Sequence, residues 1–206
     1  MKSSFLFIGT ALFVGTAASP LLFFQQHKFI LKRFWAPHYN RRLPHCPDTP
    51  DWTCEHVVPR SLFPKNESSR VVNDLNNLLL FPKYLNNMRS SLRYSESPKV
   101  QGEQVSLKSI KACQSTYLYC VHCPLKGQIN KDLATNETVF VPPAMWKGQI
   151  ARAVIEMSKK YPRYKTMINT KVLRLQTAHE WDMLYPMSEV ERVWKDIIDR
   201  MEEPKR

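Results

Sequence analysis

A short segment of the chain carries the side chains needed to hydrolyse a phosphodiester bond. His56 can act as a general base, because its ordinary pKa lies near neutrality and a positioned base accelerates a reaction by about 10² to 10⁴. Glu55 and Asn86 offer hard oxygen ligands for Mg²⁺ or another divalent cation, which acts as a Lewis acid on phosphate oxygens. Arg89 and Arg93 follow Asn86 by one and two helical turns, which suits contacts to flanking phosphates.

Two short strands and a helix are expected to position these side chains. Residues 52–58 are rich in aromatic and β-branched residues and are followed by a proline, which predicts a strand. Residues 78–81 form a second short apolar run, and Pro82 suits the first turn of a helix. Successive residues of a regular strand point to opposite faces, so Glu55 and His56 serve one site only if the first strand bends or ends there. The expected order is strand, loop, strand, helix.

Two longer helices are predicted in the second half of the chain. Residues 143–161 carry apolar residues at helical spacing, and Lys147 and Arg152 lie off that stripe, where they either contact phosphates or face solvent. The second helix starts at Ser188, which forms a capping box with Glu191. Its expected core face consists of Val190, Val193, Trp194, Ile197, Ile198 and Met201.

Five segments keep the order of the motifs of one nuclease family. They are Trp52-Thr-Cys-Glu55-His56-Val-Val-Pro59-Arg-Ser61, Asp74-Leu75-Asn76-Asn77-Leu78, Leu85-Asn86-Asn87-Met88-Arg89-Ser90, Phe140-Val-Pro-Pro143 with Lys147-Gly148-Gln-Ile150-Ala151-Arg152, and Pro186-Met-Ser188-Glu189-Val-Glu191-Arg192. With these motifs the chain resembles the endonuclease I nucleases of the ββα-metal, or His-Me finger, superfamily. The resemblance implies a single α+β domain over residues 51–202, in which a ββα-metal finger is embedded in a mostly helical structure.

The resemblance also implies roles for individual residues. His56 corresponds to the general base, Glu55 and Asn86 to the metal ligands, and Arg89 to a phosphate-contacting arginine of the active site. Asn77 looks like the polar residue that holds the finger together. The implied reaction is metal-dependent cleavage of DNA, and often RNA, with little sequence preference and 5′-phosphate ends. Arg93, Lys147 and Arg152 are the further residues expected to bind substrate.

The chain departs from the family's pattern next to the motif residues. Cys54 stands where a basic residue usually precedes Glu-His, and Asn76 stands where the second motif has histidine. The family's Asn-rich tail motif is missing. These departures keep a second hypothesis open, a catalytically silent relative that serves as a subunit of a membrane-bound complex, for example a mitochondrial one. A basic module that only binds nucleic acid is less well supported, because simple binding does not need the Glu55, His56 and Asn86 triplet.

The N-terminal part differs from the rest in composition. The 206 residues carry a net charge of +12, and residues 1–47, which contain no Asp or Glu, hold +6 of it; such an excess suits nucleic acid or an acidic membrane. Residues 1–26 include about 20 mostly apolar residues, which predict either a cleaved signal peptide or a transmembrane helix. Residues 27–50 are basic and proline-rich and are expected to form a linker. The expected location is secreted or membrane-anchored, with the mitochondrial inner membrane as one option.

The cysteines leave three hypotheses open. Their number, five, is odd, so at least one lies outside any intramolecular disulfide. Cys120 and Cys123 have the spacing of a zinc half-site, to which Cys113, Cys54 or Cys46 can add ligands. A structural Zn²⁺ site, disulfides and buried free thiols are all compatible with this pattern.

Overall fold

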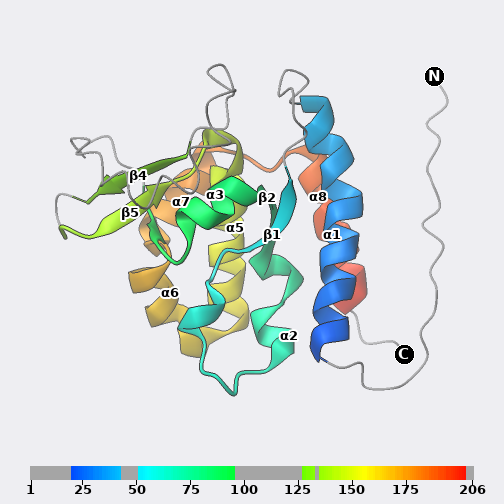
Figure 1. Ribbon diagram of the computed structural model, residues 1–206, viewed down its shortest axis with the longest axis horizontal. Coiled ribbons are helices and arrows are strands. Elements are labelled where there is room, and N and C mark those ends of the chain that lie inside the picture. Colours follow the sequence, from blue (N-terminus) through cyan, green and yellow to red (C-terminus); the bar gives the residue numbers. More distant parts are fainter. Residues whose placement is uncertain (1–19, 43–50, 96–126, 133–134, 203–206) are drawn as a thin grey trace.

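The computed structural model describes residues 20–42, 51–95, 127–132 and 135–202, which form a mixed α+β fold (Figure 1). The helices are α1 (Pro20–Arg42), α2 (Ser69–Val72), α3 (Lys83–Arg89), α5 (Ala144–Lys160), α6 (Lys165–Lys171), α7 (Leu175–Leu184) and α8 (Glu189–Glu202). The strands are β1 (Trp52–His56), β2 (Leu78–Pro82), β3 (Arg93–Tyr94), β4 (Gln128–Lys131) and β5 (Thr138–Val141). Short 3-10 helices are η1 (Arg60–Leu62), η2 (Leu75–Asn77) and η3 (Pro162–Tyr164). The α+β class expected from the sequence is confirmed.

The expected order of strand, loop, strand and helix is present in β1, β2 and α3. β1 and β2 pair antiparallel, with Glu55 opposite Leu79 and His56 opposite Leu78. β1 ends at His56, two residues earlier than expected, and α3 starts directly after Pro82. Glu55 and His56 are both paired residues of β1; the structure brings Glu55 together with Arg89 and Tyr94, and His56 together with Asn73 and Phe24. A separate sheet has the order β3-β5-β4, with β3 parallel and β4 antiparallel to β5.

α5 forms the centre of the core, as its apolar spacing predicts. It lies behind the finger in Figure 1, packs against α7, and has α6 on the side away from α1. Its fully buried apolar residues are Trp146, Ile150, Ala151, Val154 and Met157. Burying one large apolar side chain contributes about 1.5–3 kcal/mol, so this stripe is a main source of the fold's stability.

α8 packs by a narrower face than the sequence suggests. The capping box at its start is confirmed, because Glu191 accepts hydrogen bonds from the backbone N–H and the hydroxyl of Ser188. Trp194 is buried, but Val193 and Met201 are 42% and 45% exposed. The prediction that both belong to the core face was wrong, since only one side of α8 meets α1 and α5.

The expectation of a linker was wrong for residues 27–42, which belong to the long helix α1. Leu31, Trp35 and Tyr39 recur every four residues and are all buried. The Tyr39 hydroxyl donates a 2.7 Å hydrogen bond to Gln149 Oε1 of α5. Burial of this stripe stabilises the helix despite the proline inside it, which removes one backbone donor. Figure 1 shows α1 along the outer side of β1, beside α8.

Part of the sequence analysis concerns residues outside the described ranges. Residues 1–19, most of the expected hydrophobic segment, are among them, and so are Cys46, Cys113, Cys120 and Cys123. The zinc and disulfide hypotheses therefore stay predictions, while Cys54 is a buried free thiol. Of the helices that the structure describes, none has both the length and the apolarity required to cross a bilayer.

Candidate active site

Glu55 lies in the interior, where Arg89 and Tyr94 compensate its charge. α3 packs against β1 and brings Arg89 Nη1 to 2.9 Å from Glu55 Oε1. The same oxygen accepts a 2.8 Å hydrogen bond from the Tyr94 hydroxyl. Burial raises the pKa of Glu55, and the Arg89 charge and both hydrogen bonds act against that rise. Burial also raises the pKa of Tyr94, so the phenol keeps its proton and remains a donor.

Arg89 also holds the end of β1 in place. Its Nη1 and Nη2 donate to the carbonyl oxygens of His56 and Val57 at 2.9 and 2.7 Å, and its Nε donates to that of Leu92 at 3.1 Å. The guanidinium carbon lies 4.4 Å from the centroid of the Tyr94 ring. The Arg89 side chain is only 1% exposed. In this structure it contacts protein groups, in contrast to the phosphate contact expected from the sequence.

His56 makes a different set of contacts, which assigns its tautomer. Its Nε2 lies 2.9 Å from Asn73 Oδ1. Asn73 Nδ2 donates to the carbonyl and the hydroxyl of Ser69 at 3.0 and 2.8 Å, so the amide oxygen is the atom that faces His56. Nε2 therefore carries the ring hydrogen, and in the neutral ring the lone pair is on Nδ1. Nδ1 has no hydrogen-bond partner within the described part of the chain.

The surroundings keep the His56 ring neutral at pH 7. Burial lowers its pKa to about 4; the hydrogen bond to Asn73 acts in the opposite direction, and the charges of Arg60 and Arg89 add to the lowering. Sequence reasoning missed both Asn73 and Tyr94. Asn73 directly precedes the motif that starts at Asp74, which was a usable signal, whereas nothing in the sequence links Tyr94 to a residue 39 positions earlier.

Asn77 joins the loop to the end of β1. Its Oδ1 accepts a 2.7 Å hydrogen bond from the Val58 N–H, and its Nδ2 donates to the carbonyls of Val58 and Val72 at 3.2 and 2.9 Å. The Asn77 carbonyl also accepts from the Val57 N–H at 3.0 Å. Fully buried, this side chain satisfies backbone groups that no strand partner reaches, which is the holding role that the resemblance implies.

Glu55 and Asn86 have the chemistry of a divalent-cation site. Asn86 Nδ2 donates a 3.1 Å hydrogen bond to the Cys54 carbonyl, next to Glu55 on β1. Among the described residues, Asn86 Oδ1 and Glu55 Oε2 have no hydrogen-bond partner. Mg²⁺ keeps several waters and needs only one or two protein oxygens, and a carboxylate and an amide oxygen are the donor types that suit such an ion. A denser cluster of three or more His, Cys, Asp or Glu does not occur in the ranges that the structure describes.

The other cations expected at the substrate are held by protein groups. The contacts are Arg93 with Asp132 at 2.5 Å and Glu137 at 3.4 Å, Arg152 with Glu191 at 2.5 Å and Asp182 at 2.8 Å, and Lys147 with the rings of Trp181 and Tyr185 at 5.2 and 5.7 Å from the centroids. A phosphate would have to compete with these contacts. Substrate binding by Arg93, Lys147 and Arg152 therefore stays a prediction.

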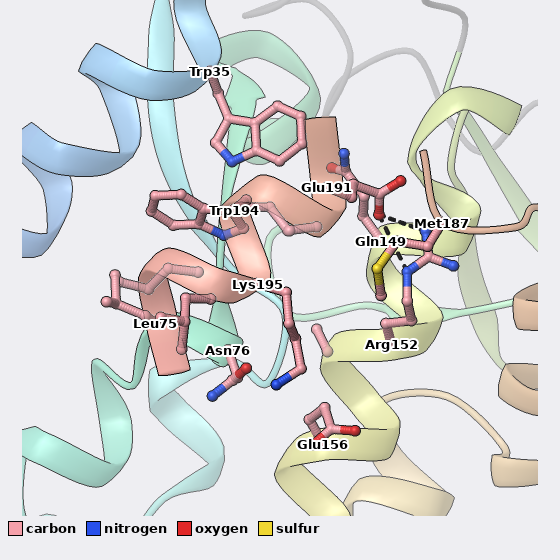
Figure 2. A pocket seen from close by; sticks show the side chains of 14 residues that line it. Trp35, Leu75, Asn76, Gln149, Arg152, Glu156, Met187, Glu191, Trp194 and Lys195 are labelled. Atoms are coloured by element: carbon pink, nitrogen blue, oxygen red, sulfur yellow. Dashed lines mark hydrogen bonds and ion pairs between the residues drawn. The ribbon is translucent and has the colours of Figure 1, made fainter. Parts of the chain in front are cut away.

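A cavity of about 90 Å³ lies between α1, α5, α8 and the segment that leads into β2. Figure 2 shows Trp35 and Trp194 at one side of it and the ion pair of Arg152 with Glu191 at another. Neither His56 nor the oxygens of the candidate cation site line it. It is therefore not the candidate active site.

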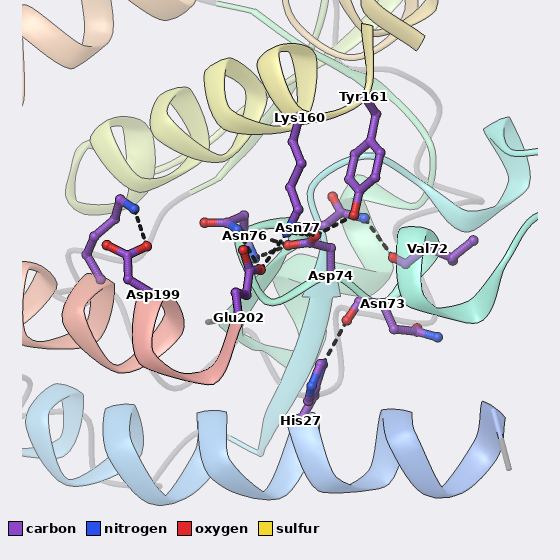
Figure 3. A network of polar contacts seen from close by, with 11 residues as sticks. His27, Val72, Asn73, Asp74, Asn76, Asn77, Lys160, Tyr161, Asp199 and Glu202 are labelled. Carbon is purple, nitrogen blue, oxygen red and sulfur yellow. Dashed lines mark hydrogen bonds and ion pairs between the residues drawn. The ribbon is translucent and has the colours of Figure 1, made fainter. Parts of the chain in front are cut away.

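A polar network fixes the segment that carries Asn73. The Asp74 carboxylate accepts hydrogen bonds from the Tyr161 hydroxyl at 2.6 Å and from Lys160 Nζ at 2.7 Å (Figure 3). Burial raises the pKa of Asp74, but the hydrogen bonds of Lys160, Tyr161 and a backbone N–H outweigh it and hold the pKa below its ordinary value. From the other side, His27 Nδ1 of α1 donates to the Asn73 carbonyl at 2.9 Å. The partner that orients His56 is thus itself anchored on two sides.

Comparison with protein families agrees with the motifs. The family model described as Endonuclease I matches residues 40–204. The match includes β1, β2, α3 and the later helices, and it leaves out nearly all of α1. A search of curated proteins found no match.

Proposed function

This chain belongs to the endonuclease I family of nucleases, and we propose that it is a divalent-metal-dependent endonuclease that cleaves DNA, and also RNA, with little sequence preference. The observation that carries the proposal is the state of His56. Its Nε2 is bound to Asn73, its Nδ1 is left with a lone pair, and its ring is neutral at pH 7. A neutral imidazole held in one tautomer is what a general base requires.

In the proposed reaction His56 acts as the base, and the neighbouring residues position it. His56 Nδ1 takes a proton from water, and the water oxygen attacks the phosphorus atom. The bond from phosphorus to the 3′ oxygen breaks, and this oxygen takes a proton from solvent water to become the 3′ hydroxyl while His56 releases its proton to solvent. The phosphate therefore stays on the 5′ end of the other product. Asn73 keeps Nδ1 directed at the water by binding the opposite nitrogen. Arg89 and Asn77 hold the end of β1 rigid, so that His56 does not have to be ordered during the reaction.

The metal would be held by Glu55 and Asn86. When bound, a divalent cation neutralises the charge that develops on the phosphate oxygens, an effect worth several kcal/mol. Burial raises the pKa of Glu55, and the Arg89 guanidinium at 2.9 Å opposes that rise and favours the carboxylate that a cation would need. Asn86 is kept beside β1 by its own hydrogen bond to Cys54.

Replacement of His56 by alanine tests the proposal. We expect His56→Ala to lower kcat by about 10² to 10⁴, the usual contribution of a positioned base. Cleavage of a fluorescent duplex by the full chain is measured with Mg²⁺ and with EDTA, and ligation of the products detects 5′-phosphate ends. His179→Ala, which changes an exposed histidine on α7, is the matched control and should cleave like the wild type.

Two outcomes would count against the proposal. Equal activity of His56→Ala and wild type would remove His56 as the base. No Mg²⁺-stimulated cleavage by the wild type would favour the alternative of a catalytically silent subunit.

A further inference from the structure

α1 carries a row of side chains along the strand that ends in His56. Phe24, Lys28 and Lys32 are four residues apart, so they lie on one face of the helix. The centroid of the Phe24 ring is 5.4 Å from that of His56. α1 packs against β1, and the two lysines are one and two helical turns along α1 from Phe24. This face of α1 therefore begins beside His56.

The charges on this face are not compensated within the described part of the chain. Lys28 and Lys32 form no ion pair there, and α1 contains no acidic residue. Arg60, which follows β1, is exposed and likewise has no carboxylate partner in the described ranges. Its guanidinium carbon is 5.9 Å from the centroid of the Phe24 ring. Arg60 therefore lies beside the ring that contacts His56, and Lys28 and Lys32 follow Phe24 on the same face of α1.

We propose that Lys28 and Lys32, together with Arg60, bind backbone phosphates of the nucleic acid that is held at His56. α1 then forms a cationic wall of the substrate-binding surface, and this inference rests on the proposed function. Two features support it. Cations without a protein partner are available to a polyanion, and they lie beside the group that must meet a phosphodiester. The family match begins at residue 40, so Lys28 and Lys32 lie outside the residues that it covers.

A lipid surface fits this face less well than a polynucleotide does. Lys28 and Lys32 are half-buried on the face of α1 that carries Phe24, whereas Arg33 and Phe29 are exposed on another face of α1. A flat anionic bilayer would contact the outward residues first. A nucleic-acid strand bound at His56 would lie next to Phe24 and so next to the face that carries the lysines.

Binding of DNA by a double variant tests the proposal. The full-length chain is titrated with a fluorescein-labelled 20-base-pair DNA duplex in EDTA, so that binding is measured without cleavage. We expect Lys28→Gln with Lys32→Gln to weaken binding roughly threefold to tenfold and to reduce the slope of log K against log salt by about 1.8, since each phosphate contact contributes about 0.9. With Mg²⁺, KM should rise while kcat at saturating DNA changes much less. Glutamine keeps the side-chain length and the helix propensity.

The matched control removes the same charge elsewhere. Lys165→Gln with Lys171→Gln changes two exposed lysines of α6, which lies across α5 from α1 in Figure 1. This double variant should keep the affinity and nearly the full salt slope of the wild type. Equal losses in the two double variants would mean that net charge alone acts, which overturns the proposal.

The remaining outcomes separate this inference from the proposed function. If the wild type binds and cleaves DNA and the α1 variant has the same affinity and slope, the wall is absent although the nuclease stands. If the α1 variant loses binding only to vesicles that contain phosphatidylserine, the face is a membrane contact and the inference is overturned. If the wild type neither binds nor cleaves, the proposed function fails and this inference fails with it.

Discussion

The two sides of β1 differ in whether their charged side chains are paired within the protein. On the side of α3, the Glu55 carboxylate is buried and is neutralised by Arg89 and a hydrogen bond from Tyr94. On the side of α1, His56 is partly exposed, and the cations near it have no acidic partner in the described residues. A buried charge must be paired because desolvation is costly, so a paired cation contributes to stability. An unpaired cation at the surface remains available for a ligand.

Loss of the buried pair should give the largest effect. We expect Arg89→Met to reduce the free energy of unfolding by about 3–5 kcal/mol, because Glu55 stays buried without its countercharge. Urea denaturation followed by circular dichroism measures the change. Arg192→Met is the control, since its pair with Glu189 is largely exposed and such pairs contribute at most about 1 kcal/mol. Similar losses in both variants would contradict the distinction between the two sides of β1.

On the other side of β1, a substitution should affect the reaction more than the fold. We expect Asn73→Ala to lower kcat roughly 10- to 100-fold, as removal of an orienting partner does in comparable sites. The accompanying loss of stability should be about 1–3 kcal/mol, because the Ser69 and His56 hydrogen bonds are lost. Asn73→Asp retains an acceptor for the Nε2 hydrogen and should recover most of kcat. If alanine and aspartate lower kcat equally, Asn73 does not position His56.

The network around Asp74 should give the smallest effect, and one that depends on pH. The pKa of Asp74 is lowered in the folded state, so its contribution to stability is present above the unfolded pKa of about 3.9 and is lost as the pH falls through the folded value. Its partner Lys160 is 36% exposed, which limits the pair to about 1 kcal/mol. Asp74→Asn should therefore lower the Tm at pH 7, and the difference from wild type should shrink below pH 4. A constant difference from pH 7 to pH 3 would show that the Asp74 charge is not responsible.

Local patterns were sufficient for much of the fold. The spacing of apolar residues located α5, the capping box located α8, and Pro82 located the start of α3. These features depend on residues at most one or two helical turns apart, which sequence spacing encodes directly. α1 was missed because the prolines of residues 37–50 dominated the interpretation, and because its apolar stripe packs against elements distant in the sequence, mainly β1, β2 and α2.

The sequence by itself determined which chemical groups are present, a carboxylate, an imidazole and an amide on a strand, loop, strand, helix segment. Only the tertiary structure decided which groups are occupied by protein contacts. Arg152 meets Glu191 39 residues away, and Glu55 meets Tyr94 at the same separation. Packing of distant elements sets such distances, which determine that His56 Nε2 faces Asn73 and that Arg152 is held in an ion pair. Spacing along the chain does not contain that information.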